Sequence, residues 1–579
     1  MSKTPKYDAK VKAILDTTEP GERTCELTGE KWVMDEEEIG WYKKFNVPPS
    51  KRSPLARQRV MAGFMIGYQW WWQRHPETNK PVLTFVHPAS GIKVLPDKEW
   101  HAADFSGIYA DYDPARSFFE QLGELERRVP FQAARNLIEP ENSIAVNSFG
   151  DINSYFTALN SQAENSFYCV WSHRAIESSD IHNVATVQQS HQIDDAGRIF
   201  NSRYVRDSGQ IQNSAFMAFC SDCEDCFGAV SQKRKKYLWF NEQLNESEYQ
   251  KRISGIDLGT RSEVLRYQER FDEMLRESVW PENMSVDAEG CVGEYLFNVR
   301  NCRYCYQCVK ASRDLFFCGF TASDTHDSAY CLSAISAADS YGCVDIFDSH
   351  ACLLCNSVGG SLHLEYCLQC IDCENCFGCV GLRRKKFCIF NRQFTEDDYW
   401  KQLDEIKCAL LARGEYGEFF PLAMSPCYFP QSGAAMYFGA TAEDGRQLGA
   451  AEYDPESLGA IGEDLIDTAK TRRSDEVPDS IDALDVDEWA GTPIMDTESK
   501  RRFAMIKPEI AHYQKLRIAP PDRHPVFRIQ QMMRRANIAV FEEVRCAKCH
   551  QSLTVAKNLA FPQRTIYCEA CYRAYMETR

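Results

Sequence analysis

The chain has 579 residues, a formal charge of −17 and an apolar fraction of 44%. This length favours about four domains, and the negative charge argues against a protein that coats nucleic acid with its whole surface, because such binding depends on neutralised phosphates. The N-terminus lacks the apolar core of a signal peptide, and the most apolar run, residues 60–72, is too short to span a bilayer. We therefore expect a cytoplasmic protein with no membrane partner.

Residues 1–135 are expected to form two small modules. We interpret residues 1–63 as a degenerate zinc-finger-like module. Residues 64–135 are a second module that ends in an amphipathic helix, because Phe118, Phe119 and Leu122 fall on one helical face.

The centre of the chain contains a duplication. The stretch from Cys220 to Tyr249 returns 150 residues later as the stretch from Cys370 to Tyr399, with no gap in the register. A long self-match at a fixed offset predicts two copies of one structural module. We place these copies at residues 136–280 and 281–451.

Both copies show a short period. Asn-Ser pairs recur in the first copy at spacings near six, as at 147–148 and 153–154, and cysteines recur in the second. Small polar residues and cysteines without helical periodicity predict two tandem β-solenoids, in which equivalent side chains stack inside a narrow core. The predicted fold is therefore mainly β with helices, and its expected solenoid core residues are Cys220, Cys223, Cys226, Cys367, Cys370, Cys373, Cys376 and Cys379.

These cysteines allow two interpretations. In a reducing compartment the 26 cysteines of the chain are more typical of metal ligands or small buried residues than of disulfides. Met217 and Ala229 stand in the first copy where the second has Cys367 and Cys379. A packed core tolerates that exchange while a cluster would lose ligands, so packed thiols are favoured. Metal binding or redox chemistry remains the alternative.

Each copy closes with a basic and aromatic segment that is predicted to be a hairpin, followed by a helix. Charge beside aromatic residues is typical of single-strand binding, whereas the structural alternative is a solvated face whose aromatic side chains pack on the solenoid end. The candidate contact residues for nucleic acid or a partner are Lys233, Arg234, Lys235, Lys236, Arg383, Arg384, Lys385 and Lys386.

The C-terminal quarter begins with an acidic stretch, residues 452–500, which we interpret as a linker. Residues 501–535 match the N-terminal module at an offset of 471, so they are predicted to be a second degenerate zinc-finger-like module. Residues 536–579 carry two Cys-x-x-Cys pairs, whose spacing is typical of a closed four-thiolate site. We expect one structural zinc ion there, bound by Cys546, Cys549, Cys568 and Cys571.

No phosphate loop, nucleophile elbow, zinc-protease motif or dinucleotide fingerprint occurs. We therefore expect a non-enzymatic scaffold that presents its repeats to a protein partner or to a second copy, with no evident small-molecule substrate. The alternatives are a nucleic-acid-associated factor that uses the ribbon and basic hairpins, and a redox or metal-handling protein.

The chain resembles an uncharacterised family of cysteine-rich zinc-ribbon proteins found in candidate-phyla (Patescibacteria-type) bacteria. The resemblance rests on four places: the segment from Cys25 to Pro49, residues 111–122, the repeat around Cys373-Glu-Asn-Cys376-Phe-Gly-Cys379, and the terminal ribbon. Where the family has a second knuckle after Val47-Pro48-Pro49, this chain has no cysteine. The resemblance implies no established activity.

Overall fold

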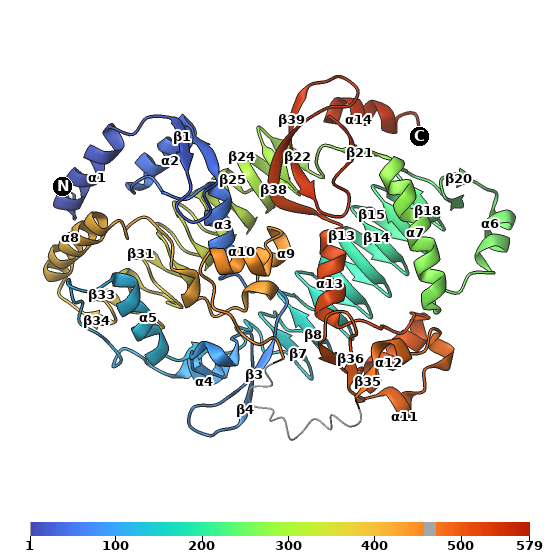
Figure 1. The fold of residues 1–579 in the computed structure, drawn as a ribbon, viewed down its shortest axis with the longest axis horizontal. Helices are drawn as coiled ribbons and strands as arrows, with labels where there is room; N and C mark the ends of the chain where they lie inside the picture. Colours follow the sequence, from blue (N-terminus) through green and yellow to red (C-terminus); the bar gives the residue numbers. More distant parts are fainter. Residues whose placement is uncertain (1, 457–470) are drawn as a thin grey trace.

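The computed structural model describes residues 2–456 and 471–579, and it contains both helices and sheets (Figure 1). Most strands belong to two long stacks of parallel strands, called here the first and second ladders. The first ladder comprises β7 (Ile144–Val146), β8 (Tyr155–Ala158), β9 (Phe167–Val170), β10 (Ala175–Ile176), β11 (Ser179–Val184), β12 (Val187–Gln188), β13 (His191–Phe200), β14 (Arg203–Arg206), β15 (Gly209–Gln212), β16 (Ala215–Ala218), β17 (Ser221–Glu224) and β18 (Phe227–Val230).

The second ladder repeats this arrangement, and a short antiparallel hairpin closes the end of each ladder. Its strands are β22 (Val286–Glu289), β23 (Val292–Glu294), β24 (Phe297–Cys308), β25 (Arg313–Phe316), β26 (Gly319–Ala322), β27 (His326–Ala329), β28 (Leu332–Ile335), β29 (Val344–Phe347), β30 (Asn356–Gly359), β31 (Leu362–Glu365), β32 (Glu374–Phe377) and β33 (Lys386–Ile389). The closing hairpins are β19 (Leu238–Trp239) with β20 (Glu242–Gln243), and β33 with β34 (Arg392–Gln393).

Strands in the ladders pair with strands one 12-residue step away. Ser179 of β11 lies beside His191 of β13, which lies beside Arg203 of β14. We call each such step a rung. The second ladder begins less regularly, since Val286 pairs with Phe297 and Arg300 pairs with Arg313, before the 12-residue register sets in from β28.

The backbone turns at every third residue. In the first ladder, φ is positive at Gln162, Asn165, Tyr168, Trp171 and each third residue up to Asp180. The residue that follows each corner points inward, and Ala163, Ser166, Cys169 and Ser172 are all buried. The recurrent Asn-Ser pairs follow from this geometry, because asparagine tolerates the left-handed corner and serine fits the narrow core. The pair at 160–161 is the exception, with Asn160 buried inside.

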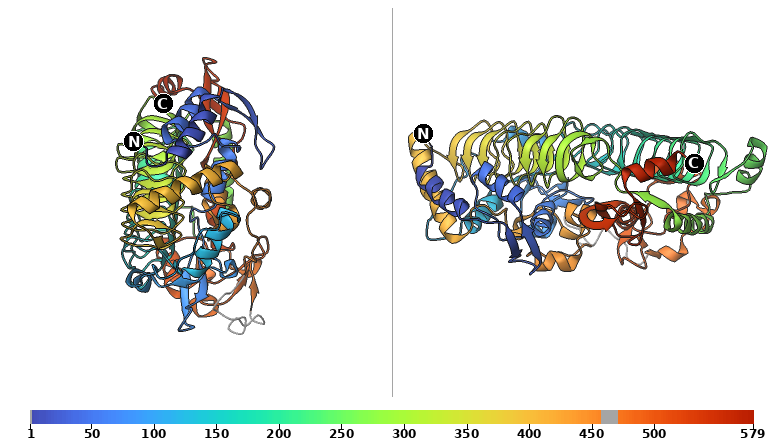
Figure 2. Two further views of the ribbon diagram at one scale, coloured as in Figure 1. Left: turned by 90° about the vertical axis from the view of Figure 1, so that its left-hand side faces the viewer. Right: turned by 90° about the horizontal axis from the view of Figure 1, so that it is seen from above.

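The N-terminal segment and the C-terminal segment gather along one side of the ladders, and no helix of the described residues lies on the opposite long side (Figure 2). The N-terminal elements are α1 (Pro5–Asp16), β1 (Gly21–Thr24), β2 (Lys31–Met34), α2 (Glu36–Phe45), α3 (Pro54–Ala62), β3 (Trp71–Arg74), β4 (Pro81–Thr84), β5 (Val94–Leu95), α4 (Asp97–Ala102), α5 (Phe118–Arg128) and β6 (Phe131–Gln132).

The remaining elements connect the ladders or follow the second one. Those between and after the ladders are α6 (Glu246–Ile253), α7 (Arg261–Glu277), β21 (Val279–Pro281), α8 (Glu396–Arg413), α9 (Gly433–Tyr437) and α10 (Ala442–Gln447). The C-terminal ones are β35 (Arg472–Arg473), α11 (Val486–Trp489), β36 (Ile494–Met495), β37 (Arg502–Phe503), α12 (Lys507–Leu516), α13 (Pro525–Arg534), β38 (Asn537–Arg545), β39 (Ser552–Asn558), β40 (Thr565–Tyr567) and α14 (Glu569–Met576).

The predicted acidic linker, 452–500, differs from the structure in its second half; residues 457–470 lie outside the described residues. Strands β35, β36 and β37 form a three-stranded sheet. Trp489 and Ile494 are buried in one apolar cluster with Ile510 and Tyr513 of the following module. The stretch folds because its sparse apolar residues have a partner module to pack against, which composition alone does not reveal.

Candidate metal centre and predicted contact residues

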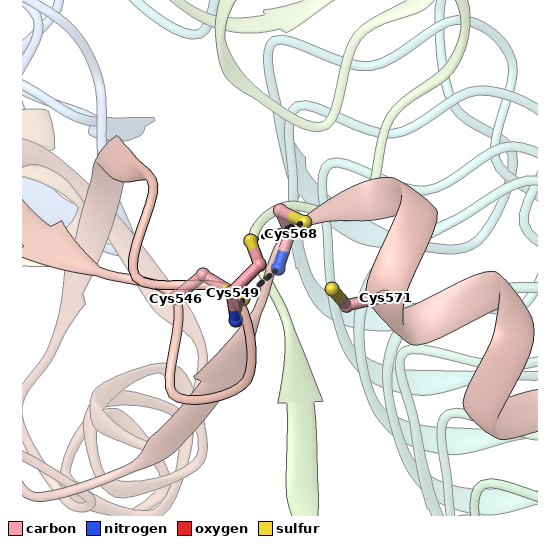
Figure 3. Close-up of side chains that lie close together, drawn as sticks. All are labelled: Cys546, Cys549, Cys568 and Cys571. Carbon is pink, nitrogen blue, oxygen red and sulfur yellow. Dashed lines mark hydrogen bonds between the residues drawn. The ribbon is translucent and has the colours of Figure 1, made fainter.

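The four cysteines of the predicted zinc site come together from a strand turn and a helix start. Cys546 follows β38, and its N–H donates to the Gln551 carbonyl (2.9 Å) while its own carbonyl accepts from the His550 N–H (2.9 Å). This tight turn also holds Cys549. Cys568 is the N-cap residue of α14, and Cys571 lies in the first turn of that helix (Figure 3).

The sulfur positions fit one metal ion. The four Sγ atoms all lie within 4.8 Å of one another, and the Sγ atoms of Cys549 and Cys568 are 3.7 Å apart. A tetrahedral zinc ion with bonds of about 2.3 Å places its sulfur ligands about 3.8 Å apart. The residues present are therefore positioned for a four-thiolate metal site.

Backbone donors favour the thiolate form of Cys546. Burial opposes ionisation of this thiol, but N–H groups of Cys549 and Cys568 point at its sulfur and lower its pKa to about 6. The N–H···S distances are 3.5 Å and 3.3 Å. Because a metal binds the thiolate, this environment lowers the cost of deprotonation on binding.

The ribbon is anchored to the end of the first ladder. Strand β40 pairs in parallel with β21, and the buried Trp280 of β21 packs between Phe219 of the ladder and Phe561 of the ribbon, with ring centroids 4.8 and 5.4 Å away. The hydroxyls of Tyr572 and Ser231 lie 2.9 Å apart. The metal centre thus sits in a fixed place against the first copy.

The predicted contact residues lie on the last rung of each ladder rather than in the hairpins. Parallel bridges join Ser221 to Lys233 and Glu224 to Lys236. Lys233 and Arg234 are exposed, Lys235 is half-buried, and the Lys236 ammonium lies 2.6 Å from the Glu224 carboxylate. In the first copy, three of the four cations therefore have no ion pair within the described residues.

The second copy differs because the N-terminal segment covers part of it. Arg383 donates to the carbonyls of His101 and Ala103, and Lys385 lies 3.5 Å from Asp104. Arg384 and Lys386 point to carboxylates one rung below them, those of Asp372 and Glu374. The two basic segments are alike in sequence but not in exposure.

Aromatic side chains beside the first basic segment are packed. The Trp239 ring stacks on Phe227 at 5.1 Å, and the Phe240 ring lies under the Arg270 guanidinium at 3.6 Å. Leu238 is buried. This arrangement matches the structural alternative, in which the aromatic residues close the end of the ladder.

The cysteines predicted for the core do point inward. Cys220, Cys223, Cys226, Cys367, Cys370, Cys373, Cys376 and Cys379 are all buried. Each thiol lies near two backbone carbonyls, as Cys220 does with those of Ala218 (3.2 Å) and Ala229 (3.4 Å). Ser166 makes the same pair of contacts with Glu164 and Ala175. Burial raises the pKa of the Cys370 thiol well above its ordinary value.

Two buried arginines were missed as functional residues, although the match at offset 471 aligns them. Arg57 lies with its guanidinium carbon 3.4 Å from the Tyr330 ring centre, and Arg528 lies 4.7 Å from that of Tyr168. Each belongs to a module docked on a ladder. The alignment of their positions was the available signal, but burial of a charge against a distant repeat leaves no local pattern.

Neither the protein-family models nor the curated proteins include a match to this chain. Among the described residues, no helix combines the length and the apolar character needed to cross a membrane.

Proposed function

We propose that the two ladders are β-solenoid modules, and that the protein is a non-enzymatic scaffold of the uncharacterised zinc-ribbon family it resembles. The parallel register of 12 residues, the corner at every third residue and the inward column of small residues support the solenoid interpretation. Solenoids present long regular faces to their partners.

The observation that carries the scaffold proposal is one straight outward column on the first ladder. Bridges and strand pairs join its members rung by rung. Apolar residues alternate along it with polar ones, and Ile152 and Phe200 are 41% and 40% exposed. The column consists of Glu141, Ile152, Glu164, Ile176, Gln188, Phe200, Gln212, Glu224 and Lys236.

Adjacent rungs lie about 4.8 Å apart, so this column offers apolar contacts at a spacing of roughly 10 Å. A single exposed apolar side chain needs no explanation, but a regular row of them supports a docking face. We propose that a protein partner, or a second copy of this chain, packs along it.

We further propose that the ion at Cys546, Cys549, Cys568 and Cys571 is one zinc ion with a structural role. Four thiolates complete a tetrahedral shell and leave no position for substrate. Metal analysis of anaerobically purified protein is expected to find zinc bound at these cysteines, and the Cys549→Ser variant is expected to lose that ion.

The scaffold proposal is tested by the assembly state of the full chain. An Ile152→Arg/Phe200→Arg double variant is expected to lose self-association in light scattering, or to lose a cross-link formed from a photoreactive residue at position 188. A photoreactive residue at the exposed Asp487 is the matched control. A monomer that gives equal cross-links from both positions contradicts the proposal.

The same material tests the nucleic-acid alternative. Salt-dependent binding of a single-stranded oligonucleotide that disappears in a Lys233→Glu/Arg234→Glu variant would replace the scaffold by a nucleic-acid-associated factor. Binding unaffected by these changes leaves the scaffold proposal in place.

A further inference from the structure

A second group of possible metal ligands lies where the two ladders meet. His182 of β11 and Asp194 of β13 are register partners one rung apart, and Asp195 follows Asp194. One ligand atom from each of the three lies within 4.8 Å of the others, and His182 Nδ1 is 2.6 Å from Asp194 Oδ1. The ladder register itself creates this set, because stacked rungs bring residues 12 apart into contact.

The group is enclosed by the second ladder and by α9. His182 and Asp194 are 1% and 3% exposed. The Tyr295 hydroxyl donates to Asp207 Oδ1 (2.9 Å), the next residue in the column of Asp195, and Gln307 Nε2 lies 3.4 Å from Asp195 Oδ1. The site is therefore formed by the packing of one ladder on the other.

The charges of this region do not balance. Three carboxylates, those of Asp194, Asp195 and Asp207, share one guanidinium, and Arg206 lies 2.8 Å from Asp207. Burial, reinforced by the charge of Asp194, raises the pKa of Asp195 well above its ordinary value. Buried carboxylates in excess need a proton or a cation.

Two shielded oxygen atoms at the group have no donor. Asp195 Oδ1 accepts from Asn183 and Gln307, but Asp195 Oδ2 has no hydrogen-bond partner. Gln307 is 5% exposed, its amide lies against Asp195, and its Oε1 also has no partner. Buried polar atoms are seldom left unpaired, so these oxygens point to a missing positive group.

The imidazole is held for coordination by its second nitrogen. His182 Nε2 lies 3.4 Å from the Tyr437 hydroxyl of α9, which leaves Nδ1 directed at the carboxylates. A partner on the far nitrogen is the usual support of a metal-binding histidine, because it fixes the tautomer and the ring orientation.

We propose that His182, Asp194 and Asp195 bind a divalent first-row transition-metal ion at the interface of the two ladders. One imidazole and two carboxylates suit manganese, iron or zinc. Ligands about 2.1 Å from an ion and at right angles lie roughly 3 Å apart, so a small widening of the His182–Asp194 contact admits it. Asp195 lines a groove of about 1710 Å³ between the ladders, which gives the ion a path from solvent.

The probe is Mn²⁺ added to full-length protein that has been stripped of metal and reloaded with one equivalent of zinc. Mn²⁺ disfavours four-thiolate sites, so the terminal ribbon does not compete for it. Electron paramagnetic resonance is expected to show one Mn²⁺ bound per chain. Binding is expected to weaken at least tenfold in Asp195→Asn and His182→Gln, and to be unchanged in Asp348→Asn, an exposed aspartate of the second ladder.

The wild-type titration decides the matter even if a variant fails to fold. Absence of a bound Mn²⁺ signal in the wild type, with Co²⁺ spectra that show thiolate coordination only, would overturn the proposal. Mn²⁺ binding that persists in both folded variants would do the same. The Cys549→Ser variant is expected to keep the Mn²⁺ site, so failure of the ribbon proposal remains distinguishable.

Discussion

Arg57 and Arg528 stand 471 residues apart and do the same work in their modules. Arg57 donates to the Tyr42 hydroxyl (3.0 Å), which in turn donates to Glu38 (2.6 Å). In the C-terminal module, the Tyr513 hydroxyl donates to Glu509 (2.8 Å), and Arg528 pairs with Asp180 of the first ladder at 3.1 Å. Each guanidinium thus joins a small module to a ladder.

Replacing Arg57 by alanine is expected to destabilise the folded chain by about 3–5 kcal/mol, because it leaves Glu38 buried without its cation. The measurement is the free energy of unfolding in urea. Arg234→Ala, which removes an exposed arginine of the first ladder, is the control and is expected to change it by less than about 0.5 kcal/mol. Equal effects of the two substitutions would refute the role of Arg57.

Glu126 makes stability depend on pH. Its side chain is 3% exposed, and burial raises its pKa from the ordinary 4.5 to about 8. The folded chain therefore keeps a proton that the unfolded chain releases above pH 4.5, so the stability from this group falls as pH rises from about 5 to 8.

A Glu126→Gln variant is expected to be more stable than the wild type at pH 8, by up to roughly 5 kcal/mol, and to differ little from it at pH 5. Urea unfolding at both values measures this. Glu120→Gln, at an exposed position of α5, should leave the pH profile as it is. A wild-type stability that does not fall towards pH 8 relative to Glu126→Gln would contradict the prediction.

At the scale of elements, the sequence predicts the parallel rungs only in part. The repeat at offset 150 places two equivalent modules, and the match at offset 471 is confirmed in detail, since α12 and α13 begin 471 residues after α2 and α3. The spacing near six, however, is twice the true corner spacing of three. Asparagine and serine mark only some corners, because left-handed φ is also imposed on residues such as Tyr168 and Trp171.

The terminal cysteines could be predicted because their ligand spacing is local. The His182 group could not, since its members become neighbours only once the register of 12 is known and the second ladder covers them. Likewise, the fold of residues 472–495 depends on the module that follows them.

The equivalence of serine and cysteine inside the ladders can be tested at Cys373. Its thiol lies 3.4 Å from the carbonyls of Ile371 and Leu382, and Ser361 occupies the rung below. Cys373→Ser is expected to cost less than about 1.5 kcal/mol, whereas Cys373→Phe overpacks the core and costs about 1–3 kcal/mol or more. A larger loss for serine than for phenylalanine would show that sulfur has a specific role.

Removing metal from the ribbon is expected to loosen β40 and α14 without unfolding the ladders. The apolar contacts of Trp280 remain, but the thiolates repel one another once the cation is gone. Hydrogen exchange of residues 546–571 should rise after chelation or in Cys549→Ser, while α5 keeps its protection. Cys408→Ser, outside the ligand set, is the control, and unchanged exchange in Cys549→Ser would argue against a structural metal.

At the scale of the whole molecule, each end of the chain contacts the ladder that lies farther from it in sequence. Lys44 pairs with Asp327 of the second ladder (2.7 Å), whereas Lys515 pairs with Glu177 of the first (2.6 Å). The ladders lie side by side, as Trp171 contacts Phe320 and Arg135 contacts Asp345. Neither half of the sequence can cover its own ladder.

A chain divided after the exposed Gly255 is therefore expected to reassemble. Fragments 1–255 and 256–579 should co-purify when expressed together, and each should aggregate alone because its ladder lacks a cover. Arg57→Ala should weaken the recovered complex. Two fragments that are each soluble and do not associate would show that the crossed contacts contribute little.

The uniform rung has a consequence for how such a chain can change in length. A segment of 12 residues inserted at a corner adds one step of about 4.8 Å and returns every later side chain to the face it had before. An insertion of six would instead carry each outward column to the opposite side. Growth of this protein is therefore quantised, and only whole steps keep its outer surface in phase.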